Sequence, residues 1–329
     1  MKDYIISLDV GKHETKSIGR RVIGSEEDIK RVHFRTKMYN LKDGYIDLEG
    51  NSHKVLYNDK EIIIGDQGET KSYETSKTNE LHLISAYTAI TQFLEPNSKN
   101  NKIYLALACP LSVLKIEEAK EEYKNFIKGN GTIDIEVDDN KYSFEIEDIV
   151  IKAEGSGLVY TEPDLFKDKT VLITDFGGLN MGLALYKNKV CSPSNRYPEE
   201  LGSDELTNIT RAELIRCKKG NIVSIEQTET AIDLGYMTKN SKPIPETIEA
   251  VKISKEKFFD KALKIIESHS IHIDELDKPV FVGGTTEKIK EIILKKIPNA
   301  YVVPNAQWTT VEGLYKVVFA KYMKVKKEG

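Results

Sequence analysis

Short apolar runs that each end in a polar turn dominate the beginning of the chain. Tyr4-Ile5-Ile6-Ser7-Leu8 predicts a strand that stops at Asp9-Val10-Gly11. The runs 54–57 and 61–65 predict two further strands, and Asn58-Asp59 between them is a turn signal. This stretch is therefore expected to form a sheet before the first helix.

Strands and helices then alternate along the rest of the sequence. Strands are expected over 103–108, 141–151, 170–174, 181–186 and 280–282, and helices over 80–94, 117–127, about 198–218, 255–268, 287–296 and 310–322. A strand that closes in Asp-x-Gly occurs at 5–11 and again at 171–177, which indicates a duplicated pattern. With 329 residues, this pattern predicts an α/β protein of two related domains.

Composition excludes several classes of function. Lys+Arg is 48 against 52 for Asp+Glu, so the chain lacks the basic excess that direct DNA binding normally requires. No apolar run is long enough for a secretory leader or a membrane span. The three cysteines have no CxxC spacing and are expected to be reduced thiols. We expect a cytoplasmic protein with no membrane partner.

The first candidate site follows the first strand, in Asp9-Val10-Gly11-Lys12-His13-Glu14-Thr15-Lys16. Backbone N–H groups of such a turn can face phosphate oxygens, and the lysines add positive charge. The strand-end carboxylate can bind Mg²⁺, usually through water. An ordinary β-turn is the alternative for this motif alone. The candidate nucleotide-binding residues are Asp9, Gly11, Lys12, His13 and Lys16, with Asp9 also a candidate metal ligand.

A second motif, Asp175-Phe176-Gly177-Gly178-Leu179-Asn180, repeats this arrangement on a later strand. Two such hairpins could hold a phosphate chain from opposite sides, and the repetition favours this interpretation over two unrelated turns. The candidate nucleotide-binding residues are Asp175, Gly177, Gly178, Leu179 and Asn180, with Asp175 as the second candidate metal ligand.

Two further segments carry candidate chemistry. The strand 280–282 opens into Gly283-Gly284-Thr285, where glycine allows a ring or ribose to approach the backbone. The full Rossmann pattern is absent there. In Ala153-Glu154-Gly155-Ser156, Glu154 could orient or deprotonate a water for attack on a γ-phosphate. A solvated loop charge is the alternative for Glu154.

Together, these segments resemble the actin, chaperone and sugar-kinase ATPases in their order along the chain. Within that superfamily the chain is most similar to the plasmid-segregating bacterial actins of the ParM family. The resemblance is carried by Asp9 to Lys16, Pro110-Leu111, Ala153 to Ser156, Leu201-Gly202-Ser203-Asp204 and Asn305 to Tyr315. Two departures stand out: Lys12-His13 and Leu179-Asn180 replace hydroxyl residues that usually contact phosphate.

The resemblance implies an actin-like (ribonuclease H-like) fold with a nucleotide cleft between two domains, 1–158 plus 310–329 and 159–309. It implies a polymerising ATPase that uses ATP or GTP with Mg²⁺, with Asp9 and Asp175 at the metal and Glu154 as the catalytic, water-orienting residue. Gly202, Asp204, Gly283, Gly284 and Thr285 would complete the nucleotide site.

The implied partners are further copies of the chain and a ParR-like DNA-binding adaptor, with centromere-like plasmid DNA contacted only indirectly. Two alternatives remain at this point. One is a non-polymerising small-molecule kinase of the same superfamily, and the other is a chaperone ATPase, for which no substrate-binding domain is visible.

Overall fold

The computed structural model describes residues 2–23, 28–41 and 46–325. It divides into two compact units: unit 1 comprises Met1–Leu165 and Trp308–Gly329, and unit 2 comprises Phe166–Gln307. Within the described ranges, no helix has the length and apolar character needed to cross a membrane.

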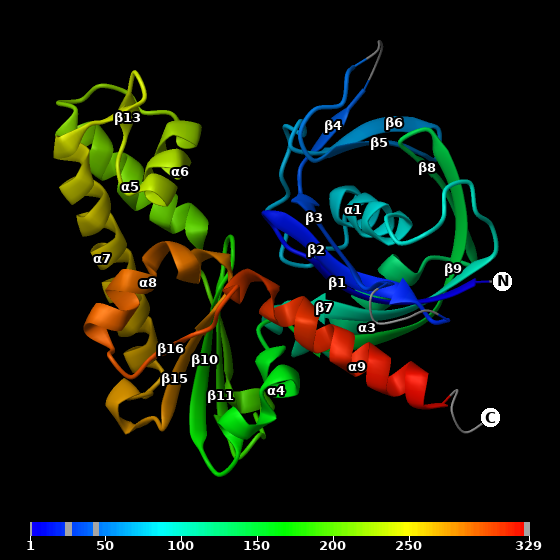
Figure 1. The fold of residues 1–329 in the computed structure, drawn as a ribbon. Coiled ribbons are helices and arrows are strands. Elements are labelled where there is room, and N and C mark those ends of the chain that lie inside the picture. Colours follow the sequence, from blue (N-terminus) through cyan, green and yellow to red (C-terminus); the bar gives the residue numbers. More distant parts are fainter. Residues whose placement is uncertain (1, 24–27, 42–45, 326–329) are drawn as a thin grey trace. The chain divides into compact units, whose positions relative to one another are not determined.

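Unit 1 is built on a mixed sheet that curls around a buried helix, α1 (Figure 1). Among the described residues the sheet has nine strands in the order β3-β2-β1-β7-β9-β8-β5-β6-β4. The strands are β1 (Lys2–Val10), β2 (Glu14–Arg21), β3 (Lys30–Arg35), β4 (Met38–Asn40), β5 (Ser52–Tyr57), β6 (Lys60–Gly65), β7 (Asn101–Cys109), β8 (Thr132–Val137) and β9 (Asn140–Ala153). The helices are α1 (Glu80–Thr91), α2 (Leu111–Leu114), α3 (Glu117–Lys128), α4 (Leu158–Thr161) and α9 (Thr309–Val325).

Strand β1 is buried on both faces because helices cover both sides of this part of the sheet. Its alternate residues Tyr4, Ile6 and Leu8 belong to the core that contains α1. Ile5 points the other way and packs with Leu314 of α9. Such double burial is why this strand is an almost continuous apolar run rather than an alternating one.

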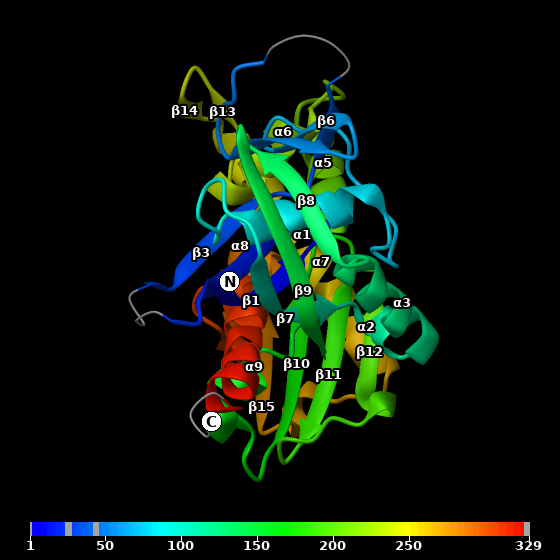
Figure 2. The same ribbon diagram turned by 90° about the vertical axis from the view of Figure 1, so that its right-hand side faces the viewer.

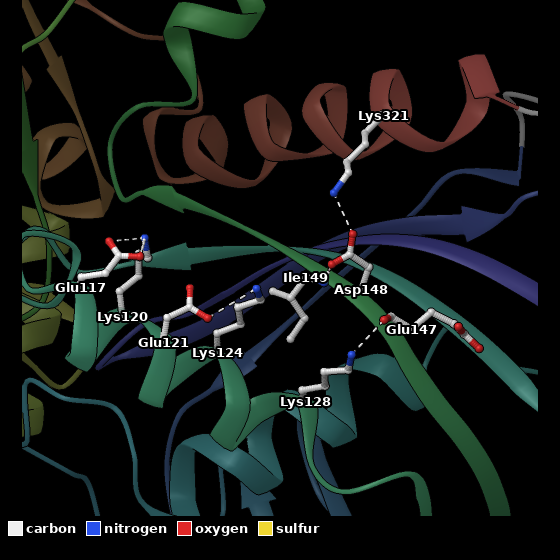
Figure 3. Close-up of polar contacts among 9 residues, drawn as sticks. All are labelled: Glu117, Lys120, Glu121, Lys124, Lys128, Glu147, Asp148, Ile149 and Lys321. Atoms are coloured by element: carbon white, nitrogen blue, oxygen red, sulfur yellow. Dashed lines mark hydrogen bonds and ion pairs between the residues drawn. The ribbon is translucent and has the colours of Figure 1, made fainter.

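A β-bulge shapes the long strand β9 where it pairs with β7. Ile103 lies opposite Ile146, but Tyr104 lies opposite Asp148, so Glu147 is the extra residue. The Glu147 carbonyl accepts a hydrogen bond from Lys128 Nζ of α3 at 3.0 Å, which satisfies a backbone group that the bulge leaves out of the ladder (Figure 3).

The residue after the bulge ties β9 to the C-terminal helix. Asp148 Oδ2 accepts a hydrogen bond from Lys321 Nζ at 2.7 Å (Figure 3) and another from the Tyr322 hydroxyl at 2.5 Å. Burial and the neighbouring carboxylate raise the pKa of Tyr322 to about 12, so its hydroxyl stays a donor. The bulge thus turns this carboxylate to the face of the sheet on which α9 packs.

Unit 2 has a five-stranded sheet, among its described residues, in the order β12-β11-β10-β15-β16. Its strands are β10 (Thr170–Phe176), β11 (Met181–Lys187), β12 (Arg196–Glu199), β15 (Lys278–Val282) and β16 (Tyr301–Val302), with a separate hairpin of β13 (Thr238–Lys239) and β14 (Lys242–Pro243). Its helices are α5 (Ser203–Cys217), α6 (Ile225–Leu234), α7 (Pro245–Ser268) and α8 (Gly284–Lys296). Short 3-10 turns lie within unit 2 at Pro193–Asn195 and Ile273–Glu275, and at its two boundaries with unit 1 at Pro163–Phe166 and Ala306–Trp308. Its core joins Phe176 and Phe281 of the sheet to Phe258 and Phe259 of α7. Figure 2 gives a second view of the strands β10 and β11.

The helix α7 starts ten residues earlier than the apolar pattern indicates. The predicted segment begins at Lys255, whereas the helix begins at Pro245, and proline is well suited to a first helical position. The buried face of this first part is made of small or polar side chains such as Thr247, Ala250 and Ser254. Such residues carry little hydrophobic contrast, which explains why the prediction was short.

Two glycines allow α9 to pack directly against the loop after β9. A Cβ on Gly313 would lie 2.2 Å from the Cα of Gly157. A Cβ on Gly157 would lie 1.8 Å from the Thr309 carbonyl oxygen. The same joint contains a hydrogen bond of 3.1 Å from the Gly155 amide to the Thr310 hydroxyl. These contacts involve backbone on both sides, so a side-chain rotation cannot relieve an added methyl group.

Substitution of Gly313 by alanine should therefore destabilise the protein although alanine favours helices. We expect a loss of about 1–3 kcal/mol in the free energy of unfolding, measured by urea denaturation of the full chain. Gly284→Ala is the matched control, because a Cβ there would meet no atom closer than 4.0 Å. Equal stability of the two variants would show that the joint is looser than its backbone contacts indicate.

Candidate functional site

The two predicted Asp-x-Gly motifs form hairpins with the same construction. In the first, Asp9 pairs with Lys16 across β1 and β2, and the Gly11 amide donates to the Glu14 carbonyl at 3.0 Å. Each carboxylate belongs to the penultimate residue of its strand.

The second hairpin repeats these contacts in unit 2. Asp175 pairs with Gly182 across β10 and β11, and the Gly177 amide donates to the Asn180 carbonyl at 2.9 Å. In both units the first strand also pairs in parallel with a later one, β7 or β15. The duplication inferred from sequence is thus present in strand pairing and turn geometry.

In unit 2, three glycine segments that are far apart in sequence meet beside Asp175. The Gly177 carbonyl accepts hydrogen bonds from the Ser203 amide at 3.0 Å and from the Thr285 hydroxyl at 3.3 Å. The Asp204 amide donates to the Gly178 carbonyl at 3.1 Å. The structure therefore brings together the predicted residues of all three segments at the ends of β10 and β15.

The backbone at Gly202 lies so close to the backbone of Gly178 and Leu179 that only glycine fits there. A Cβ there would lie 2.2 Å from the Gly178 carbonyl oxygen and 2.5 Å from the carbonyl carbon of Leu179. The turn 177–180 thus packs directly on the start of α5. Leu179 contributes its backbone to this contact, and the Asn180 carbonyl closes the turn.

The two residues of the glycine pair after β15 have different roles. Gly283 has φ of +91°, and a Cβ there would lie 2.4 Å from Asp175 Oδ1, so its conformation and space both require glycine. Gly284 has open space, with Gln307 Cβ at 4.0 Å as its nearest neighbour. Gly283 is therefore a structural turn that contacts the carboxylate, whereas no contact with the described residues requires glycine at Gly284.

Two helices of unit 2 begin at this same edge. Helix α5 follows Gly202 and helix α8 follows Gly283, and neither N-cap makes a side-chain capping hydrogen bond. The first turn of a helix has N–H groups without a partner inside the helix and lies at the positive end of the helix dipole. At the start of α5, the Ser203 and Asp204 amides already donate to the carbonyls of Gly177 and Gly178. This edge can therefore attract an anion such as a phosphate group.

In unit 1, a buried lysine joins the two candidate carboxylates. Lys77 is 2% exposed and forms ion pairs with Glu154 and with Asp9, the latter at 3.7 Å. Burial opposes the charged amine, but the two carboxylates outweigh it and raise the pKa of Lys77 above its usual value. Burial raises the pKa of Glu154, and the negative charge of Asp9 raises it further, whereas the positive charge of Lys77 lowers it.

Lys12 and His82 also adjoin this cluster. Burial and the charge of Lys77 lower the pKa of Lys12 to about 8. Lys12 Nζ is buried and makes no hydrogen bond within the described ranges. Burial and the two lysines lower the pKa of His82 to about 3, so its ring is neutral. An unsatisfied buried ammonium on the phosphate turn suits an anionic ligand.

Two further neighbours of the cluster, Cys109 and Tyr123, are neutral groups. Burial and Glu154 raise the pKa of Cys109 to about 12, and burial also raises the pKa of Tyr123. The Glu154 amide donates to the Cys109 carbonyl at 3.0 Å, which fixes the glutamate backbone at the ends of β7 and β9. The side chain of Glu154 remains 30% exposed, enough for contact with a ligand or water.

The other predicted residues of the first hairpin lie on its turn and second strand. Lys16 Nζ forms an ion pair of 2.9 Å with Glu14. Burial opposes ionisation of Glu14, but Lys16 holds its pKa below the usual value. The His13 carbonyl accepts a hydrogen bond of 2.9 Å from the Thr36 amide. The charge of Lys16 is thus largely paired, which distinguishes it from Lys12.

A magnesium site is compatible with the donors in this cluster. Among the described residues no group of three or more His, Cys, Asp or Glu side chains is placed to hold a metal ion. Mg²⁺ commonly uses one or two carboxylates and keeps several waters, so a dense cluster is not needed. Asp9 Oδ1 is buried and makes no hydrogen bond in the described part of the chain, but it lies 3.7 Å from Lys77 Nζ and so already faces one cation. The assignment of Asp9 and Asp175 to one metal stays a prediction.

Sequence reasoning missed Lys77, the residue that connects Asp9 to Glu154. It lies in a polar stretch between β6 and α1, without apolar periodicity. One signal was available: Asn79 precedes the helix and caps it, with its side chain accepting from the His82 amide. That cap fixes the loop end but does not reveal that a lysine two residues earlier is buried.

Comparison with known proteins was made for the whole chain. The family model described as the N-terminal domain of actin-like proteins matches residues 7–157. A search of curated proteins finds no match. The Alp12 filament structure is 52% identical, with 98% of this chain and 100% of that chain covered and a TM-score of 0.71.

More distant structures share the fold. Ta0583, an archaeal actin homolog solved in complex with ADP, is 14% identical, covers 96% of this chain and 99% of its own, and has a TM-score of 0.73. A ParM from Clostridium botulinum, solved as a 15-stranded filament, is 17% identical, covers 97% of this chain and 100% of its own, and has a TM-score of 0.72. Because its identity to Alp12 extends over nearly the full length of both proteins, this chain has the actin-like fold and belongs to the family of actin-like proteins.

Proposed function

We propose that this chain binds ATP with Mg²⁺, hydrolyses it, and polymerises into dynamic filaments that segregate plasmid DNA in the cytoplasm. The observation that carries the proposal is the 52% identity to Alp12, a protein whose structure is that of a filament. Head-to-tail contacts that do not close into a ring would produce such a polymer. A ParR-like adaptor would link filament and plasmid, so that the DNA is contacted only indirectly. GTP in place of ATP is a variant of the same proposal.

The geometry within each unit supports nucleotide binding. In unit 2, backbone N–H groups of the turn after Asp175 and of the start of α8 would donate to phosphate oxygens, whereas the Ser203 and Asp204 amides of α5 already hold that turn. Gly284 would leave room for the adenosine, whereas the space beside Gly202 is taken by the backbone of the turn 177–180. In unit 1, Lys12 would neutralise phosphate charge, since its buried ammonium has no hydrogen-bond partner in the described residues.

Hydrolysis would depend on positioning rather than on covalent chemistry by the protein. Glu154 would accept a hydrogen bond from the attacking water and align it with the γ-phosphorus. Asp9 and Asp175 would hold Mg²⁺, which supplies charge neutralisation at the phosphates. A glutamate whose backbone is fixed at a strand end and whose side chain is 30% exposed is suited to this role.

Removal of the unit 2 carboxylate by Asp175→Ala should abolish the Mg²⁺ dependence of nucleotide binding. We expect affinity for Mg²⁺-ATP to fall about tenfold or more, the value of one lost charge-assisted contact of about 1.5–3 kcal/mol. Titration with a fluorescent nucleotide, in the presence of Mg²⁺ or of EDTA, measures the affinity and its dependence on Mg²⁺. Asp274→Ala, at an exposed carboxylate of the same unit, is the control. Unchanged affinity and turnover in Asp175→Ala would rule out the assignment.

A branched side chain at Gly284 should interfere with the nucleotide and not with the fold. Since a Cβ there has open space, Gly284→Val should keep its unfolding free energy within about 1 kcal/mol. Nucleotide affinity should fall about tenfold or more if the ring or ribose lies against this residue, as overpacking costs about 1–3 kcal/mol. Lys290→Val, exposed on the same helix, is the control. Normal ATP binding by Gly284→Val would mean that the nucleotide lies elsewhere.

Replacement of Glu154 by glutamine should separate polymer assembly from its disassembly. Phosphate release should fall by roughly 10²–10⁴-fold, the range typical of a general base, while nucleotide binding persists. Glutamine keeps the size of the side chain beside the buried Lys77, which makes it gentler than alanine. Wild-type polymer should pellet with ATP above a critical concentration and decay as phosphate is released, whereas variant polymer should persist.

One assay that records phosphate release and pelletable polymer together tests both the role of Glu154 and the filament proposal. Normal phosphate release from Glu154→Gln would mean that another carboxylate orients the water. A wild-type protein that stays monomeric with ATP at tens of micromolar, at low and high salt, would remove the filament proposal. The hypothesis to test would then be a non-polymerising small-molecule kinase.

A further inference from the structure

Lys77 is a buried charged residue of unit 1. Its side chain is 2% exposed, although lysine is almost never fully buried unless it is paired. The carboxylates of Glu154 and Asp9 supply that pairing, and both are candidate residues of the proposed hydrolysis site. Its other titratable neighbours include Lys12, whose charge repels it, and His82, whose ring is neutral.

The backbone delivers Lys77 to this position at a conformational cost. Lys77 has φ of +58°, a left-handed backbone conformation that residues other than glycine and asparagine seldom adopt. Two residues later, Asn79 caps α1 through the His82 amide at 3.2 Å and also contacts the His82 ring at 2.9 Å. The capped helix therefore anchors the loop at the point where the lysine turns inward.

Glu154 reaches the same place from a different element. Its amide is fixed by the Cys109 carbonyl, and the next residue, Gly155, is hydrogen-bonded to Thr310 of α9. The Glu154 backbone is thus rigid, but a glutamate side chain still has several rotamers. Lys77 Nζ donates to Glu154 Oε1, which removes that freedom and leaves the second oxygen for another partner.

We propose that Lys77 is a positioning residue for hydrolysis: its ammonium holds one oxygen of Glu154 so that the other accepts a hydrogen bond from the attacking water. This inference rests on the proposed function, in which Glu154 orients that water. Lys77 contacts neither water nor phosphate in this role and acts through Glu154 alone. Misplacement of a positioned group by about 1 Å can cost about 10²-fold in rate, so the effect on turnover should be large.

A double-mutant cycle tests this inference because it asks whether Lys77 acts through Glu154. The four proteins are wild type, Lys77→Met, Glu154→Gln and the double variant, with Lys71→Met, a half-buried lysine of the same loop, as control. Phosphate release at saturating ATP, affinity for a fluorescent nucleotide and the half-maximal Mg²⁺ concentration are measured for each.

We expect Lys77→Met to lower the rate of phosphate release by at least about tenfold with nucleotide affinity and Mg²⁺ requirement nearly unchanged. In the Glu154→Gln background, the same substitution should cause no further loss. Lys77→Arg, which keeps the charge and the donor, should restore part of the rate. Lys71→Met should behave as wild type.

The outcomes that contradict the proposal are distinct. An equal fold-loss from Lys77→Met in both backgrounds, or a shifted Mg²⁺ requirement, would overturn the positioning role and leave the proposed function standing. A normal rate in Glu154→Gln would overturn the water-orienting assignment and this inference with it. If Lys77→Met does not fold, Lys77→Arg compared in the two backgrounds gives the same test, because it introduces no unpaired buried carboxylate.

Discussion

Contact between backbones without an intervening Cβ is the constraint on which the candidate site depends. In unit 2 the turn after β10 packs on the start of α5 only because Gly202 has no side chain. The turn after β15 reaches Asp175 only because Gly283 has none. In unit 1 the loop that carries Glu154 is held by the joint between Gly157 and Gly313. Asp175 and the loop of Glu154 are thus placed by glycines that lie elsewhere in the sequence.

This constraint explains how much of the site the sequence could predict. Asp-x-Gly after a strand is a local signal, and both hairpins have the pairing that the repeated motif indicates. The glycine segments were also recognisable, but their partners were not, since a clash with the Gly178 carbonyl depends on tertiary packing. For the same reason, local pattern does not distinguish Gly283, which must be glycine, from Gly284, which has open space.

Lys77 shows the limit of reasoning from pattern. A lysine in a polar loop is normally solvated, and neither its neighbours nor its spacing suggests burial. Its charge is retained because two carboxylates from β1 and from the end of β9 approach it from elements distant in sequence. The early part of α7 was missed for a related reason, since its buried face consists of small or polar residues. In both cases tertiary contacts, and not local hydrophobicity, determine the structure.

Local charge balance in unit 1 differs from what the whole chain suggests. The net charge of −4 is spread over 100 ionisable acids and bases, 48 basic and 52 acidic, and predicts nothing about one site. Around Asp9 and Glu154, however, two lysines face two carboxylates, and burial strengthens every interaction among them. Both carboxylates form ion pairs with Lys77, so Lys12 is left with a buried charge and no hydrogen bond in the described residues. An anion is the partner that would relieve this imbalance, which ties the electrostatics of unit 1 to the phosphate chemistry proposed for the fold.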